Sequence, residues 1–231
     1  MESRDSDDNS NIIITRPSPG VFNELMICLN SLRNISLRNI PSLTSFPRNG
    51  LPKTIQSLKI WKCENLEFLP YESFHNYKSL EHLEISDSCN SMTSFTVCSL
   101  PVLRSLCIYG SKNVKSILIA EDASQQKLLL LRTIKIEHND ELESFSLGGF
   151  PAPNLIHLSL CNCKKLHSLP ESINTLASLQ EMKIHDLPNL HLFSIDDLPS
   201  ITGTECWQCW RSFMEYNLGT SYFSFRIDNS R

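Results

Sequence analysis

The sequence predicts an α/β repeat solenoid, a fold in which copies of one short unit stack along an axis. The first observation is an apolar pattern, nearly complete in residues 55–70 and 155–170, that reads Leu/Ile-x-x-Leu-x-Leu/Ile-x-x-Cys-x-x-Leu-x-x-Leu-Pro. The second is its spacing. The third apolar residue of successive copies falls at Leu37, Ile60, Ile85, Ile108, Ile136, Leu160 and Ile184. These positions are separated by 23, 25, 23, 28, 24 and 24 residues, within the range of about 20–29 that is typical of leucine-rich repeats.

Each copy is expected to contribute one short strand, because Leu-x-Leu places two apolar side chains on the same face of an extended chain. One copy cannot bury these side chains alone, so neighbouring copies stack and their strands pair in parallel. The sequence therefore predicts a leucine-rich-repeat horseshoe with a concave parallel sheet of about seven short strands. The convex segments are expected to be mostly irregular or short-helical, with a short helix near residues 120–127.

The ninth position of the pattern predicts a buried structural ladder, since Asn or Cys at this place bonds to loop backbone in folds of this kind. Cys63, Asn139 and Cys163 occupy this position, and Cys89 occupies it after one inserted residue. The copies that depart from the rule carry Ile40, Ser111 and Leu187. We therefore expect an irregular ladder.

The repeats divide the chain into three segments. Residues 1–28 are polar, with a candidate degraded repeat at 12–14, residues 29–195 form the leucine-rich-repeat domain, and residues 196–231 form a C-terminal tail or cap. Alternating apolar residues at 223, 225 and 227 fit a capping strand, and a frayed tail is the alternative. At the other end, the repeat that starts at Leu32 is expected to be poorly covered and to leave an open sheet edge.

Composition excludes several classes of function. The net charge is −4 and the pI is near 6.0, so nucleic acid is not expected as a partner. The first ten residues are acidic and polar rather than a secretory signal, and no apolar run reaches the roughly 18 residues of a membrane span. Without a secretory signal, the nine cysteines are expected to be reduced thiols in a cytoplasmic protein.

No motif for catalysis, metal binding or cofactor binding is recognised, so we expect no enzyme activity, no metal and no cofactor. None of the seven glycines precedes lysine, which excludes a P-loop, and neither a Gly-x-Ser-x-Gly elbow nor a His-Glu-x-x-His helix occurs. Cys206 and Cys209 form a lone Cys-x-x-Cys. Half of a zinc site or a redox pair is one interpretation, and two incidental thiols is the simpler one.

A protein-binding surface is predicted on the concave side, at the residue between the two strand leucines and at the residues that follow the strand. Trp61 and Tyr109 depart from an ordinary polar surface there, and both residue types are enriched at binding hot spots. They lie two repeats apart, about 10 Å across the sheet, although two exposed aromatics can also occur without a function. The predicted binding residues are Lys59, Trp61, Lys62, Glu84, Tyr109, Lys135, Glu137, Lys183 and His185.

Residues 58–70 and 158–170 resemble the repeats of plant intracellular nucleotide-binding leucine-rich-repeat immune receptors, the disease-resistance proteins. The resemblance rests on the ninth-position cysteine and the closing Leu-Pro, and it covers about residues 29–195. In that family the repeats restrain a nucleotide-binding switch and help to recognise pathogen effectors or guarded host proteins. The resemblance implies a cytoplasmic, non-catalytic recognition module in plant defence, whose partner is an effector, a guarded host protein or a nucleotide-binding domain. Neither upstream domain is present here, so nucleotide-driven signalling is not implied.

Two other functions remain open at this point. A leucine-rich-repeat substrate receptor of an F-box ubiquitin ligase would share the repeats, and an F-box ahead of residue 1 would identify it. A thiol- or zinc-dependent enzyme would use Cys206 and Cys209, and Cys206→Ser would then remove its activity or its bound zinc.

Overall fold

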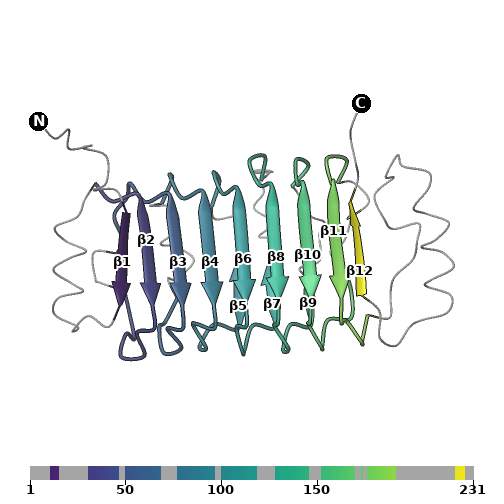
Figure 1. Ribbon diagram of the computed structural model, residues 1–231, viewed down its shortest axis with the longest axis horizontal. Coiled ribbons are helices and arrows are strands. Elements are labelled where there is room, and N and C mark those ends of the chain that lie inside the picture. The colour runs from purple at the N-terminus through teal and green to yellow at the C-terminus, as the bar shows by residue number, and fades with distance from the viewer. Residues whose placement is uncertain are drawn as a thin grey trace, which may run out of the picture.

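A nine-stranded sheet dominates the structure, in the order β1-β2-β3-β4-β6-β8-β10-β11-β12 (Figure 1). The computed structural model describes residues 11–15, 31–46, 50–68, 77–96, 100–118, 128–145, 152–169, 173, 176–190 and 222–226. The strands of this sheet are β1 (Asn11–Thr15), β2 (Asn34–Arg38), β3 (Ser57–Trp61), β4 (His82–Ser86), β6 (Ser105–Tyr109), β8 (Thr133–Glu137), β10 (His157–Cys161), β11 (Glu181–His185) and β12 (Tyr222–Arg226). Every neighbouring pair is parallel except β11 and β12, which run antiparallel. This large parallel sheet is the one that the repeats predict.

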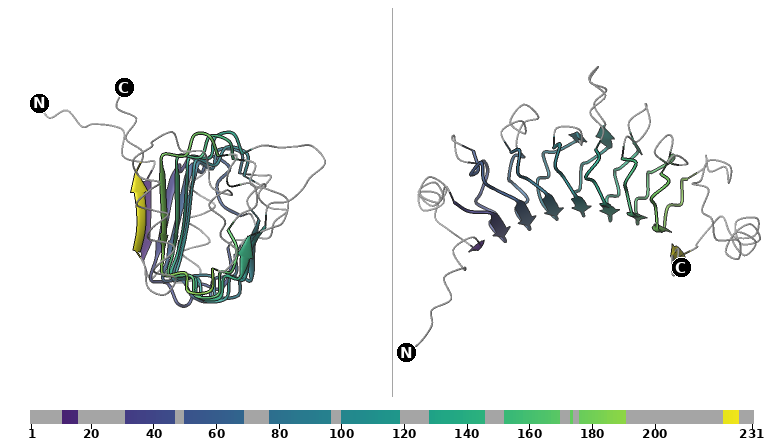
Figure 2. Two further views of the ribbon diagram at one scale, coloured as in Figure 1. Left: turned by 90° about the vertical axis from the view of Figure 1, so that its right-hand side faces the viewer. Right: turned by 90° about the horizontal axis from the view of Figure 1, so that it is seen from above.

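The register of the sheet follows the repeat, because paired residues occupy the same position in successive copies. Leu58 of β3 pairs with Leu83 of β4, and Ile60 pairs with Ile85. The strands line one side of an arc, and the connecting segments return along the other side (Figure 2). The strands therefore form the concave face of a leucine-rich-repeat solenoid, which confirms the predicted fold class.

The core lies behind the sheet and is built from the second and fourth residues of each strand. In β3, Leu58 is 1% exposed and Ile60 is fully buried, whereas Lys59 between them is exposed. Further along each repeat, residues such as Leu66 and Leu166 are also fully buried and join the same continuous cluster. A fully buried Leu or Ile side chain contributes roughly 1.5–3 kcal/mol of transfer free energy, so the stacked repeats stabilise one another.

Each strand of the nine-stranded sheet from β2 to β11 ends in the same sharp turn. The residue directly after the strand has a positive φ in all seven cases: Asn39, Lys62, Asp87, Gly110, His138, Asn162 and Asp186. In the first six of these turns, the backbone N–H of this residue donates to the carbonyl of the last strand residue of the next repeat, as from Lys62 to Ser86 at 3.0 Å. Asn, Asp and Gly tolerate this left-handed conformation best, which accounts for most residues found there.

The N-terminal end of the sheet differs from expectation. Ile12, Ile13 and Ile14 lie in β1, which pairs with β2 at an offset of 23 residues. Leu32 is only 2% exposed and Ile35 only 1%. The prediction of a poorly covered Leu32 repeat is therefore wrong, because the weak isoleucine match provides one more strand.

The convex side and the C-terminal segment also add strands that the repeat pattern did not predict. A second parallel sheet consists of β5 (Ser94–Thr96), β7 (Ser116–Leu118) and β9 (Ser144–Phe145), in that order. The short helix expected near residues 120–127 lies outside the described residues. Residues 222–226 form β12, which pairs antiparallel with β11. Within the described residues, no helix has the length and apolar character needed to cross a membrane.

Candidate protein-binding face

Strand alternation turns the first, third and fifth residues of each strand towards the concave face. We call the third residues the middle row: Ile13, Ser36, Lys59, Glu84, Cys107, Lys135, Ser159 and Lys183. We call the fifth residues the rim row: Thr15, Arg38, Trp61, Ser86, Tyr109, Glu137, Cys161 and His185. Eight of the nine predicted binding residues fall in these two rows, and Lys62 follows β3 directly.

Large and small side chains alternate within the rows, so the face has raised and recessed positions. Trp61 and Tyr109 are 41% and 39% exposed, whereas Ser86 between them in the rim row is 8% exposed. Ser36 and Ser159 of the middle row are also buried, although their outward positions led us to expect solvent exposure. Larger side chains contact both serines: Arg38 Nε donates to the Ser36 hydroxyl at 2.9 Å, and the Ser159 hydroxyl donates to Glu137 Oε1 at 2.7 Å.

The two exposed aromatic residues are each supported by a neighbouring side chain. The Lys62 ammonium lies over the Trp61 ring, 4.7 Å from its centroid, in a cation–π contact. The Tyr109 ring packs against the His138 ring at a centroid distance of 4.7 Å. These contacts restrain the aromatic side chains before any partner arrives, which lowers the entropy cost of binding.

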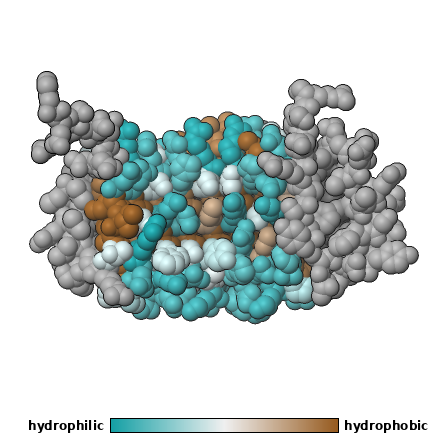
Figure 3. Space-filling view, viewed as in Figure 1, coloured by the Kyte–Doolittle hydropathy of each residue, from teal (hydrophilic) through white to brown (hydrophobic). Residues whose placement is uncertain are grey.

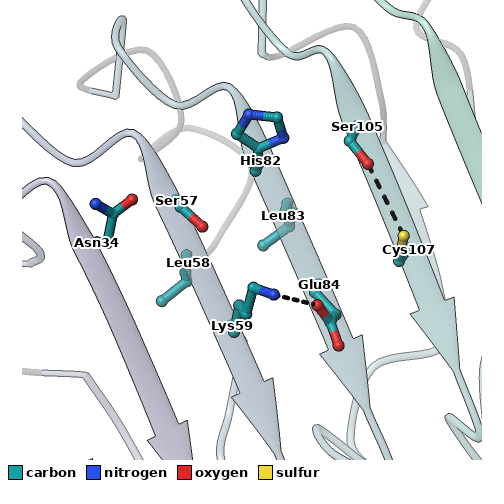
Figure 4. Close-up of a pocket in the computed structure, with 9 residues that line it drawn as sticks. All are labelled: Asn34, Ser57, Leu58, Lys59, His82, Leu83, Glu84, Ser105 and Cys107. Atoms are coloured by element: carbon teal, nitrogen blue, oxygen red, sulfur yellow. Dashed lines mark hydrogen bonds and ion pairs between the residues drawn. The ribbon is translucent and has the colours of Figure 1, made fainter. Parts of the chain in front are cut away.

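A hollow of about 310 Å³ is lined by residues of β2, β3, β4 and β6 (Figure 4). Asn34, Ser57 and His82 line its upper part, and Lys59 and Glu84 form an ion pair across it at 3.1 Å. Both ionic side chains are about half exposed, so this pair contributes less than about 1 kcal/mol to stability. A partner can therefore displace it at little cost.

Behind the rim, the predicted ladder residues are buried as a set: Cys63, Cys89, Asn139 and Cys163 are each 0% exposed. Asn139 has the fullest set of hydrogen bonds. Its Oδ1 accepts from the Ser111 N–H at 2.9 Å, and its Nδ2 donates to the Ile108 and Glu137 carbonyls at 2.9 and 3.0 Å. The thiol of Cys163 donates weakly to the Cys161 carbonyl at 3.4 Å.

In the repeat with the inserted residue, two neighbours share the ladder role. Ser88 Oγ accepts from the Cys63 N–H at 2.9 Å and donates to the Ser86 carbonyl at 2.6 Å, as Asn139 does in its own repeat. Cys89 supplies the backbone carbonyl of the following turn, which accepts from the Met92 N–H at 2.8 Å. The ladder pattern of Asn and Cys did not predict Ser88, although Ser88 lies three residues after Ile85, the same offset that separates Cys63 from Ile60.

Burial controls the chemistry of the cysteine thiols. Desolvation raises the pKa of Cys89 and of Cys163 to about 12, and it raises the pKa of Cys63 in the same direction. The thiol of Cys161 on the concave face also has a raised pKa because it is partly buried. These cysteines are poor nucleophiles at neutral pH, since the thiolate is the reactive form.

Among the described residues, no group of three or more His, Cys, Asp and Glu side chains is arranged to hold a metal ion. Cys206 and Cys209, the pair of the alternative zinc or redox interpretation, lie outside the described residues.

Comparison with known proteins finds sequence similarity to plant proteins. The chain is 34% identical over 139 residues to a putative disease resistance protein of Arabidopsis thaliana. Its homologues are plant disease-resistance proteins. Two further examples from the same plant are the protein SUPPRESSOR OF npr1-1, CONSTITUTIVE 1, at 28% identity over 165 residues, and the disease resistance protein UNI, at 30% identity over 117 residues.

The similarity to disease-resistance proteins covers part of this chain and a small part of each relative. It spans 60%, 71% and 48% of this chain, respectively, but only 10%, 9% and 13% of those much longer relatives. Among solved structures, the leucine-rich repeat domain of the type III effector XopL aligns with 74% of this chain and 67% of its own chain. That alignment has a TM-score of 0.46 and 21% identity. No protein-family model matches the sequence.

Proposed function

We propose that this chain is a non-catalytic protein-recognition module in plant defence that binds its partner on the concave face. The observation that carries the proposal is the exposure of Trp61 and Tyr109, at 41% and 39%, on a face otherwise lined mostly by polar side chains. Aromatic side chains that stay exposed and restrained are characteristic anchors of protein interfaces. The disease-resistance homologues supply the biological setting.

The geometry supports binding to a protein surface rather than to a small molecule. All nine residues that line the hollow belong to β2, β3, β4 and β6 of the concave sheet, so one layer of the fold forms it (Figure 4). Ser86 lies between the two aromatics and is largely buried, so this position is recessed and can accommodate a partner side chain. A stack of paired strands holds these positions rigidly, so little ordering of the face is needed on binding.

A more specific role follows from the homologues by analogy. We propose that the partner is a pathogen effector, a guarded host protein or the nucleotide-binding domain of a receptor. Binding in the cytoplasm is part of the same proposal.

Capture experiments with purified chain as bait test the proposal. Extracts of infected and healthy plant tissue are passed over the wild-type chain and over a Trp61→Ala/Tyr109→Ala double variant. Proteins that depend on the concave face are expected to be lost from the double variant. The matched control is Leu129→Ala, because Leu129 is 50% exposed and belongs to neither row of the concave face. Identical capture by wild-type chain and double variant would refute the two aromatics as anchors.

A further inference from the structure

Charge is distributed unevenly along the concave face. Strands β1, β2 and β3 contain no Asp or Glu, and the rows over them carry the cations Arg38 and Lys59, followed directly by Lys62. From β4 onward, carboxylates join the lysines, beginning with Glu84. One end of the face therefore carries an excess of positive charge, although the whole chain has a net charge of −4.

Two of the three cations at this end are available to a partner. Arg38 donates from Nε to the neutral Ser36 hydroxyl at 2.9 Å, and the Lys62 ammonium rests on the Trp61 ring. Within the part of the chain that the structure describes, neither group has a carboxylate at ion-pair distance. Lys59 differs, because it pairs with Glu84 at 3.1 Å.

Apolar surface lies beside these cations. Ile13 is 62% exposed in the middle row of β1, and Trp61 is 41% exposed in the rim row of β3. Figure 3 shows this face, with a brown hydrophobic area over β1 next to white and teal residues. Strand geometry puts Ile13 and Trp61 about 12 Å apart, two strands across and two residues along. Ser36 lies between them and is 8% exposed, so the surface dips there.

We propose that this end of the concave face binds an acidic protein segment that also carries apolar side chains. Carboxylates of the segment contact Arg38 and Lys62, while its apolar side chains pack on Ile13 and Trp61. Complementary charge steers the segment to this end of the face and sets its direction, and the apolar contacts slow its release. The inference deepens the proposed function by naming the chemistry of the partner.

A protein partner fits these features better than nucleic acid does. Nucleic-acid binding draws its affinity from many Lys and Arg contacts to phosphates. Here the end of the face over β1 to β3 offers Arg38 and Lys62, and Lys59 is already paired with a carboxylate. An exposed isoleucine beside them matches an aliphatic or aromatic side chain of a peptide.

A peptide selection tests the proposal. A library of random peptides displayed on phage is selected against the immobilised full chain, and the best binder is measured by fluorescence anisotropy. We expect the selected peptides to be enriched in Asp and Glu next to apolar residues. Selection of peptides without acidic enrichment would overturn the proposal.

Charge reversal locates the site. Arg38→Glu combined with Lys62→Glu should weaken binding of the selected acidic peptide at least about tenfold, which corresponds to about 1.4 kcal/mol. Lys53→Glu is the matched control, since Lys53 is exposed in the turn before β3 and should change affinity less than about twofold. Equal affinity of the double variant and wild-type chain would overturn the proposal. Tighter binding of oligo(dT) than of the peptide would overturn it in favour of nucleic acid.

The outcomes separate this inference from the proposed function. Proteins captured from plant extract can depend on Trp61 and Tyr109 while remaining insensitive to the Arg38→Glu/Lys62→Glu change. In that case the concave face is a recognition surface, and the proposal that its partner is an acidic segment is wrong.

Discussion

A single buried amide, that of Asn139, connects two neighbouring repeats. It accepts from the Ser111 N–H of the preceding repeat and donates to the Ile108 carbonyl of that same repeat. Both backbone groups would otherwise be buried without a partner, and an unsatisfied buried polar group costs about 1–3 kcal/mol. Cysteine and serine at other ladder positions form fewer bonds of the same kind, which makes Asn139 the most strongly bonded residue of the ladder.

Asn139→Ala should therefore destabilise the chain by about 2–5 kcal/mol, because several hydrogen bonds are lost in one substitution. Urea denaturation followed by circular dichroism measures the free energy of unfolding. The control is Asn113→Ala, whose exposed amide donates one hydrogen bond to the Asn90 carbonyl and should cost less than about 1 kcal/mol. Equal losses for the two variants would mean that burial of Asn139 has no energetic consequence.

The buried thiols predict a stability loss at high pH. The pKa of Cys163 rises from 9.0 to about 12 on burial, so the unfolded chain loses this proton first as the pH rises. The stabilising contribution is complete below pH 9 and disappears as the pH approaches 12. Over that window, each such thiol lowers the free energy of unfolding by up to about 1.4 kcal/mol per pH unit.

Replacement of one thiol isolates this effect from the titration of lysines. Urea denaturation of wild-type chain and of Cys163→Ala between pH 8 and pH 11 should give a shallower pH dependence for the variant, although its stability at pH 8 is lower. Parallel pH profiles would show that Cys163 ionises normally in the folded chain.

At the scale of strands and turns, the repeat pattern predicted the register because its period of two within Leu-x-Leu decides which side chains are buried. Leu58 and Ile60 illustrate this, since each pairs with its counterpart in the next repeat. The second sheet, β5-β7-β9, could not be predicted in the same way. Its strands are two or three residues long, which is too short for an alternating pattern, and their pairing depends on stacking that the main sheet imposes.

The candidate site was predictable to a similar extent. Alternation identified Trp61 and Tyr109 as outward residues, and the structure places both in the rim row with substantial exposure. Alternation could not reveal that Ser36 and Ser159 are buried, because their burial depends on how larger side chains such as Arg38 and Glu137 lie against them. The ladder rule names Asn and Cys at the ninth position, so it did not predict a ladder role for Ser88. The hydrogen bonds of Ser88 identify that role.

Gly110 tests the turn that ends each strand. Its φ is +61°, and a Cβ there would clash with Asp87 Oδ1. Gly110→Ala should cost about 1–2 kcal/mol for the left-handed conformation, plus a further cost for displacing Asp87. In an Asp87→Ala background the clash is removed, so the second cost should vanish in a double-mutant cycle measured by urea denaturation. Additive losses would mean that Asp87 moves aside without strain.

At the scale of the whole molecule, the main contacts between the described strands run between neighbours in the sheet. Stability of such a stack is approximately a sum of repeat terms and interfaces between adjacent repeats. A local defect at one end should therefore remain local. Strand β1 is a suitable place to test this, because among the described strands it lies at the N-terminal edge of the sheet and pairs only with β2.

Ile14→Pro should detach β1, because proline removes the N–H of a residue that is paired with Leu37. We expect hydrogen exchange monitored by mass spectrometry to become faster in β2 and to a smaller degree in β3, while β8 and β10 keep their wild-type protection. Ile14→Val retains the N–H and most of the apolar contact, so it should leave β2 protected. Faster exchange throughout the sheet after Ile14→Pro would contradict nearest-neighbour stability. It would indicate that β1 stabilises the solenoid as one cooperative unit, and that the N-terminal strand is as important to the fold as the regular repeats behind it.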